Sequence, residues 1–356
     1  MKRRSWVCLG LSAAVLVAGA LVQPAAHAQK DPNNYRVTWD DFRDGFDTSS
    51  PAAKWFYFSA GPFVGNDGIE TTSKQGLNVV APGINAGTGE PAFTLTLAQE
   101  DENGGLPGAL DHVKWLVYAL NFSSGGFPGF DAVPGYELGC ESWIRGTTYG
   151  TEGHPFGDEI DNPNDDNRLS AVGMNTIDFE SFMVFDFFVT NETIYAIYER
   201  LPFARPVLGN YAAFTFSIPL ATTAPGEQHH LKVAYDRGAG VVRWIVDGVE
   251  RFSVDQIGHR IDRQFMTLDH GGTEVDVEPR QLACGMGMFT LLDAHRPSGT
   301  GLVRLSSVPD FYFDPEVGEP TPETFLDDES LEENRLFGQG AEISVKKYVV
   351  SSKPTD

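Results

Sequence analysis

The sequence is poor in cysteine, in basic residues and in long apolar runs, and each shortage excludes a class of protein. It has three cysteines among 356 residues, with no CxxC or Cys/His spacing of the kind that binds zinc. Lys and Arg number 26 against 49 Asp and Glu, and the formal net charge of −23 argues against nucleic acid or an anionic membrane as a partner. After the first 28 residues no apolar stretch is long enough to cross a bilayer, so we expect no membrane span.

The N-terminus has the pattern of a cleavable export signal. Lys2, Arg3 and Arg4 precede an apolar run from Trp6 to Val22, and the small-residue sequence Ala26-His27-Ala28 follows. A basic start, an apolar centre and an A-x-A site are typical of a signal peptide. We therefore predict a signal peptide at 1–28, a secreted extracellular protein, and one mature domain at 29–356.

Two cysteines remain in that mature chain, Cys140 and Cys284. In an oxidising compartment they form either one disulfide or two separately buried thiols. The sequence leaves both alternatives open.

The rest of the chain is dominated by short runs of β-branched and aromatic residues. Met183 to Thr190 and Val241 to Val246 are examples, and glycine-containing turns such as Asp247-Gly248 separate such runs. No stretch keeps a long helical period. We predict an all-β fold, a two-sheet antiparallel sandwich with long surface loops. An acidic, proline-containing segment at about 309–335 is expected to cross the surface, before a terminal strand at 341–350.

Three segments resemble the concanavalin A-like lectin/glucanase superfamily, whose fold is a jelly roll. They are the opening Trp39 to Asp47, the strand pair His229–Asp236 and Val241–Glu250, and the terminal strand. The relatives that this chain resembles are exported proteins with no assigned function. The resemblance implies a secreted protein whose concave sheet face binds, and in one version hydrolyses, an extracellular or cell-wall polysaccharide. A non-catalytic structural or protein-binding secreted domain is the alternative.

One strand offers a pair of carboxylates for glycoside cleavage. Side chains alternate along Tyr136 to Ile144, so Glu137 and Glu141 share a face. Glu137-x-Gly139-x-Glu141 resembles the E-x-D-x-E strand of family glucanases, with glycine in place of the central Asp. The alternative is two solvated acids on an outward strand.

A second pair lies later in the chain. If the segment at 175–180 is extended, Asp178 and Glu180 share its outer face about 7 Å apart by Cα. Mutual repulsion would raise one of their pKa values, as acid–base work requires. Two hydrated acids at a strand edge are the alternative.

Sugar binding also needs flat aromatic faces and hydrogen-bond donors. Trp143 shares the face of Glu137 and Glu141, so we expect it to be exposed there. The other candidate substrate-binding residues are Arg145, Trp115, Tyr198, Arg200 and His270. For the aromatic ones, packing in the core is the alternative.

The loop at 157–167 is rich in oxygen ligands. Asp158, Asp161 and Asp165 are candidate ligands for a structural Ca²⁺, although the loop lacks the spacing of an EF-hand. The alternative is a solvated acidic loop, and we expect no other cofactor.

Overall fold

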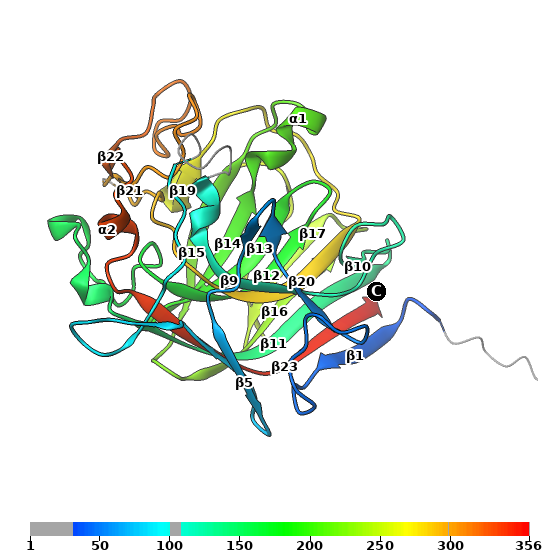
Figure 1. Ribbon diagram of the computed structural model, residues 1–356. Helices are drawn as coiled ribbons and strands as arrows, with labels where there is room; N and C mark the ends of the chain where they lie inside the picture. The colour runs from blue at the N-terminus through cyan, green and yellow to red at the C-terminus, as the bar shows by residue number, and fades with distance from the viewer. Residues whose placement is uncertain (1–30, 100–107, 298, 356) are drawn as a thin grey trace, which may run out of the picture. The chain divides into compact units, whose positions relative to one another are not determined.

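Two large antiparallel sheets form the body of the fold in the computed structural model (Figure 1). The structure describes residues 31–99, 108–297 and 299–355, so the expected signal peptide lies outside the described residues. The predicted all-β, jelly-roll sandwich is confirmed. In the described ranges, no helix is long and apolar enough to cross a membrane.

The first sheet, called here the β11 sheet, has eight strands in the order β18-β17-β16-β11-β23-β6-β5, with β1 paired to β23. These strands are β1 (Tyr35–Asp40), β5 (Ile69–Ser73), β6 (Gly76–Val80), β11 (Tyr136–Tyr149), β16 (Gln228–Asp236), β17 (Val241–Val246), β18 (Val249–Val254) and β23 (Gly340–Pro354).

The second sheet, called here the β13 sheet, has nine strands in the order β19-β15-β14-β13-β12-β20-β9-β2, with β10 paired to β20. These strands are β2 (Trp55–Tyr57), β9 (Val113–Ala119), β10 (Phe130–Asp131), β12 (Ala171–Asp178), β13 (Met183–Val189), β14 (Thr193–Arg200), β15 (Phe214–Thr222), β19 (Met266–Asp269) and β20 (Gln281–Phe289).

Short elements fill the connections. Outside the two large sheets, the described part of the chain forms the short strands β3 (Ser59–Ala60), β4 (Phe63–Val64), β7 (Gly83–Ile84), β8 (Pro91–Ala92), β21 (Gly301–Val303) and β22 (Phe325–Asp327). Among the residues that the structure describes, the helices are α1 (Arg205–Leu208), α2 (Glu332–Arg335) and the short 3₁₀ turns η1 (Gly108–His112), η2 (Thr151–Gly153), η3 (Gly157–Glu159), η4 (Pro202–Ala204) and η5 (Arg263–Phe265).

The main core lies between the two sheets and is closed by a disulfide. Leu138 and Ile144 of β11 face Met174 and Phe185 of the β13 sheet in one buried cluster. Within this cluster Cys140 of β11 bonds to Cys284 of β20, 144 residues later, with their Cα atoms 5.8 Å apart. Of the two alternatives for these cysteines, the structure has the single disulfide, and this bond links one sheet to the other.

The turn predicted at Asp247-Gly248 is present and joins two antiparallel strands. Val246 pairs with Val249, and the two residues between them have positive φ angles of 51° and 80°. Such a two-residue turn matches the twist of the flanking strands, and glycine adopts this backbone region without strain. β17 and β18 therefore form a tight hairpin at the edge of the β11 sheet.

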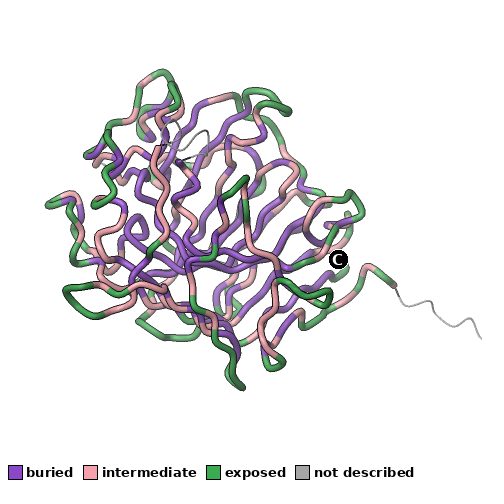
Figure 2. Tube along the Cα trace, in the orientation of Figure 1, coloured by how far each residue is buried: buried purple, intermediate pink, exposed green. Residues whose placement is uncertain are grey.

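The outer faces of the two sheets differ in burial. Every residue of β12 and β13 is buried, whereas β1, β5 and β18 of the β11 sheet carry exposed residues (Figure 2). The outer face of the β13 sheet packs against residues from 291 to 325, including Leu291, Tyr312 and Phe325, in a second apolar cluster. The acidic segment expected to cross the surface thus contributes aromatic residues to a cover over this face.

Candidate functional site

The first expected pair of carboxylates lies on the outer face of the β11 sheet, and each member is neutralised. Glu137 accepts a hydrogen bond from Lys232 Nζ at 2.7 Å, and Arg243 lies 3.5 Å from its other oxygen. Glu141 contacts Arg36 at 3.0 Å and His230 at 2.8 Å. Although burial acts against it, the hydrogen bond from His230 and the nearby Arg36 lower the pKa of Glu141. A carboxyl held ionised in this way is a poor proton donor.

Trp143 shares that outer face, and two neighbouring side chains contact its ring. The His230 ring stacks on it at 4.0 Å with an interplanar angle of 8°, and Lys347 Nζ lies 4.1 Å from its centroid. Trp143 is partly exposed beside the two acids, and neighbouring strands supply these two stacking partners.

The second expected pair, Asp178 and Glu180, belongs to the other sheet and closes a turn. Asp178 is buried and accepts hydrogen bonds from the side chains of Ser181 and Gln281. Burial raises the pKa of Asp178, whereas two hydrogen bonds from Arg280 lower the pKa of Glu180. The two pairs of acids lie on different sheets and do not form one site.

The expected sugar-binding residues are also dispersed. Trp115 and Tyr198 are fully buried in the main core, so for these two residues the alternative of core packing is the one observed. Arg200 is buried with its guanidinium carbon 3.8 Å from the centre of the Tyr211 ring, and Arg145 is exposed on β11. Arg145 thus shares the outer face of β11 with Glu137 and Glu141, whereas Trp115, Tyr198 and Arg200 are buried elsewhere.

The acidic loop has no metal cluster. Asp158 and Asp161 lie at exposed or partly exposed positions, and Asp165 accepts a hydrogen bond from Thr190 Oγ1 at 3.0 Å. In the described part of the chain, no group of three or more His, Cys, Asp or Glu side chains is placed to hold a metal ion. The geometry thus offers no set of ligands for the expected Ca²⁺.

A cavity of about 120 Å³ lies instead on the outer face of the β13 sheet. It is lined by Ile177, Val184, Phe188 and Phe289 of this sheet and by Leu291, which follows β20. Most of its lining is apolar. Seven side chains with hydrogen-bonding or titratable groups also line it: His112, Tyr118, Asn175, Asp186, Glu199, His270 and Asp293.

Asp186 and Glu199 lie on the same face of adjacent strands. In the β13–β14 register Asp186 pairs with Ile197, so Glu199 is its diagonal neighbour two residues further along. Such neighbours have Cα atoms roughly 7 to 8 Å apart, close enough for both side chains to contact one small molecule.

Glu199 is the group of this cavity that titrates near neutrality. Burial raises its pKa to about 7, although a hydrogen bond from Thr215 and the charge of His112 act in the opposite direction. Part of Glu199 remains accessible, whereas its strand neighbours Tyr198 and Arg200 are buried. A carboxyl with this pKa can give or take a proton at physiological pH.

Asp186 is held more tightly. Burial raises its pKa well above the ordinary value, against hydrogen bonds from the Thr176 backbone N–H and Asn175 Nδ2, each at 2.6 Å. The negative charge of Glu199 adds to the increase. At neutral pH the two carboxyls of this face therefore carry less than two full negative charges.

His112 and Asp293 form an ion pair beside Glu199. His112 Nε2 lies 2.9 Å from Asp293 Oδ1, and its Nδ1 donates to the Thr290 carbonyl at 2.9 Å. Burial alone lowers the pKa of His112, but the carboxylate of Asp293 outweighs it and raises the pKa to about 9. Tyr312 from the covering segment donates to the other oxygen of Asp293 at 2.7 Å. The imidazolium therefore supplies a positive charge that favours ionised Glu199.

His270, expected from the sequence as a binding residue, lines this cavity in the neutral state. Burial lowers its pKa to about 4, and its Nδ1 donates to the Phe311 carbonyl at 2.6 Å. Its Nε2 is thus the unprotonated nitrogen.

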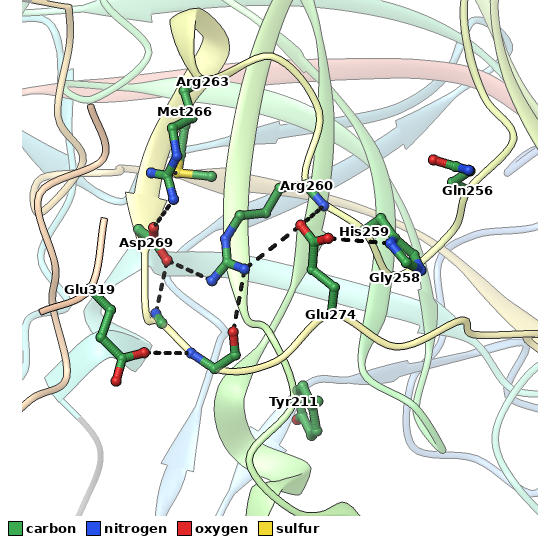
Figure 3. Close-up of polar contacts among 12 residues, drawn as sticks. Tyr211, Gln256, Gly258, His259, Arg260, Arg263, Met266, Asp269, Glu274 and Glu319 are labelled. Atoms are coloured by element: carbon green, nitrogen blue, oxygen red, sulfur yellow. Dashed lines mark hydrogen bonds and ion pairs between the residues drawn. The ribbon is translucent and has the colours of Figure 1, made fainter. Parts of the chain in front are cut away.

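A network of ion pairs fixes the loop that carries His270 (Figure 3). Asp269 accepts from Arg260 at 3.0 Å and from Arg263 at 2.9 Å, and it also accepts the Gly271 N–H. Glu319, from the covering segment, accepts the Gly272 N–H at 3.2 Å. These contacts anchor the segment that covers the cavity to the loop beside it.

The burial of Asp186 and Glu199 could have been predicted from the apolar residues around them in the sequence. Asp186 stands in Met183–Val189, a strand that is otherwise wholly apolar, and Glu199 follows the largely apolar run from Ile194 to Tyr198. Acids in strands of this composition are rarely buried without a partner or a role. No such short-range signal pointed to His112 or Asp293, which meet only in the folded chain.

Comparisons with known proteins match this chain to proteins of open function and to carbohydrate-active structures. A family model described as "Family of unknown function (DUF6081)" matches residues 39–354. The Uncharacterized protein L829 of Acanthamoeba polyphaga mimivirus is 28% identical, covering 66% of this chain and 61% of that protein. The chain therefore spans about three fifths of the length of this viral relative.

Similar solved structures have low identity. The endo-1,3-beta-glucanase from Streptomyces sioyaensis has 13% identity and a TM-score of 0.43, covering 94% of this chain and all of that one. Alginate lyase A1-II' has 10% identity and a TM-score of 0.38, covering 80% and 84% of the two chains. The Crh5 transglycosylase has 10% identity and a TM-score of 0.37, covering 90% and 84%.

Proposed function

The chain belongs to this family of unknown function, and we propose that it is a secreted protein that hydrolyses a glycosidic bond at the cavity on the β13 sheet. The observation that carries the proposal is a cavity lined by two carboxyls on adjacent strands, Asp186 and Glu199, where burial raises the pKa of Glu199 to about 7. Glycoside cleavage requires a carboxyl that is protonated at the working pH and a second one nearby. The superfamily resemblance supports a glycan as the class of substrate, and the buried disulfide supports export.

Glu199 is the proton donor in this proposal. It transfers its proton to the glycosidic oxygen while the bond from that oxygen to the sugar carbon breaks, and the electron pair stays on the oxygen. Water then adds to the sugar carbon, and its released proton returns to Glu199. Asp186 is the second carboxyl, and the His112–Asp293 pair is a positioning element that tunes the charge next to Glu199.

Release of reducing sugar from a panel of polysaccharides tests the proposal. We expect Glu199→Gln to lose at least a hundredfold in rate, because the amide cannot donate the proton. The wild-type rate should fall as the pH rises through about 7, as Glu199 loses its proton. Glu141→Gln, on the opposite sheet, is the matched control and should keep full activity. Unchanged hydrolysis in Glu199→Gln would remove this residue from the mechanism.

Glycan binding without cleavage is a second candidate, favoured by a polar groove on the same sheet. This groove of about 300 Å³ is lined by Asn167, Ser217, Gln264 and Arg296, beside the ring of Phe265. Amides, hydroxyls and a guanidinium are suitable partners for sugar hydroxyls. Glycan-array binding that is lost in Gln264→Ala, with no hydrolysis, would favour this candidate. A wild-type protein that binds no glycan would leave the structural or protein-binding alternative.

A further inference from the structure

The cavity around Glu199 has the wrong lining for a sugar ring. Its interior surface comes mainly from aliphatic and phenyl groups, such as Leu116, Ile177, Val184 and Leu268. Sugar hydroxyls placed there would lose hydrogen bonds to water without replacing them. A cavity of about 120 Å³ lined in this way matches the size and polarity of one small aromatic ring.

Half-buried phenylalanines border the cavity. Phe58, Phe179, Phe182, Phe203 and Phe311 all line it, and none of them is fully covered. They come from separate loops and turns around the sheet, so together they form an apolar rim. A molecule entering past this rim meets apolar surface before it reaches the carboxyls.

One polar atom in this cavity lacks a partner. Asn175 is about 1% exposed and its Nδ2 donates to Asp186, but its Oδ1 has no hydrogen-bond partner among the described residues. A buried acceptor left unsatisfied is costly, and a donor on a bound molecule removes the cost. An O–H or N–H group on an otherwise apolar ligand can supply this missing partner.

We infer that the cavity takes the leaving group of the substrate, a compact apolar alcohol of about one aromatic ring, and that the substrate is a glycoside of such an alcohol. The inference rests on the proposed hydrolysis and specifies its substrate class. The sugar stays outside the rim. When Glu199 protonates the glycosidic oxygen and the bond to the sugar carbon breaks, the alcohol gains the O–H that Asn175 Oδ1 can accept.

Calorimetric titration of the full mature chain with phenol and toluene tests the cavity directly. Phenol should bind about tenfold more tightly than toluene, because only phenol can donate to Asn175. Ala109→Trp and Leu201→Trp each place a large ring at the cavity lining and should abolish phenol binding. Ala86→Trp, on an exposed loop, should leave it unchanged. Circular dichroism confirms that each variant is folded.

Hydrolysis assays separate this inference from the proposed function. Cleavage of phenyl glycosides at least tenfold faster than of unsubstituted oligosaccharides, lost in Ala109→Trp, would support the inference. Glu199-dependent cleavage of polysaccharides by a protein that binds neither phenol nor toluene would overturn the inference and leave the proposed function standing. Phenol binding without cleavage of any glycoside would overturn both the hydrolysis and the leaving-group assignment. Equal binding of toluene and phenol would overturn the role given to Asn175.

Discussion

The outer faces of the two sheets place carboxyl groups in opposite environments. On the β11 sheet, Glu137 and Glu141 are each paired with cations, and the pKa of Glu141 is lowered. On the β13 sheet, burial raises the pKa values of Asp186 and Glu199. Both faces carry two acids on neighbouring or shared strands. The difference is the cover that residues from 291 to 325 place over the second face, so it is burial rather than spacing that prepares a carboxyl for proton transfer.

The largest expected effect comes from the disulfide that links the two sheets. Replacing both Cys140 and Cys284 with alanine removes a cross-link between residues 144 positions apart. We expect a loss of about 4 kcal/mol in the free energy of unfolding, because the unfolded chain regains the freedom of a long loop. Urea denaturation of the variant and of the oxidised wild type measures it. A loss below about 1 kcal/mol would mean that the core holds the sheets together without the bond.

The next largest effect is expected at the ion pair beside Glu199. Asp293→Asn leaves His112 without its carboxylate, and we expect a loss of about 3 kcal/mol at pH 6. The pKa of His112 in the folded protein is about 9, above its ordinary 6.5, so this pair stabilises fully below pH 6.5 and less as the pH rises through 9. The difference between variant and wild type should shrink by pH 10.

Histidine signals in NMR spectra give an independent measurement of the same change. In Asp293→Asn the titration midpoint of His112 should fall from about 9 to below 6.5, since burial then acts unopposed. An unchanged midpoint would show that Asp293 does not set the charge next to Glu199.

Glu199→Gln should act on stability with the opposite sign. The pKa of Glu199 in the folded protein lies above its ordinary 4.5, so its contribution favours folding below pH 4.5 and is lost as the pH rises through 7. Removing the charge should stabilise the protein by about 2 kcal/mol at pH 8, a figure reduced because the residue is partly accessible. Denaturation at pH 4 and pH 8 checks it. A destabilised variant at pH 8 would show that Glu199 is satisfied as an anion.

The strands, the β17–β18 hairpin and the alternation of side chains along β11 could be predicted from the sequence, because each depends on residues a few positions apart. Leu138, Cys140 and Ile144 face the core as alternation predicts, with Glu141 on the other side. The location of the cavity could not be predicted in this way. It depends on a segment more than a hundred residues from Asp186 that folds over one sheet face and leaves the other open. Alternation shows which residues share a face, but not what covers that face.

The smallest expected effect belongs to the open face, at Glu141. Its carboxylate contacts Arg36, which is half-exposed, and His230. Ion pairs with solvated partners contribute less than about 1 kcal/mol, so Glu141→Gln should lose no more than this at pH 8. Because the pKa of Glu141 in the folded protein is lowered, its contribution should vanish as the pH falls through that pKa.

Glu141→Gln and Glu199→Gln therefore remove the same charge from the two faces and should shift stability at pH 8 in opposite directions. Denaturation of both variants under identical conditions makes the comparison independent of any substrate. Two losses of similar size would mean that the cover over the β13 sheet does not create a distinct environment for its carboxyls. Opposite shifts would instead show that burial keeps the acids of the covered face from their preferred, ionised state. A carboxyl kept protonated in this way can transfer its proton to a substrate.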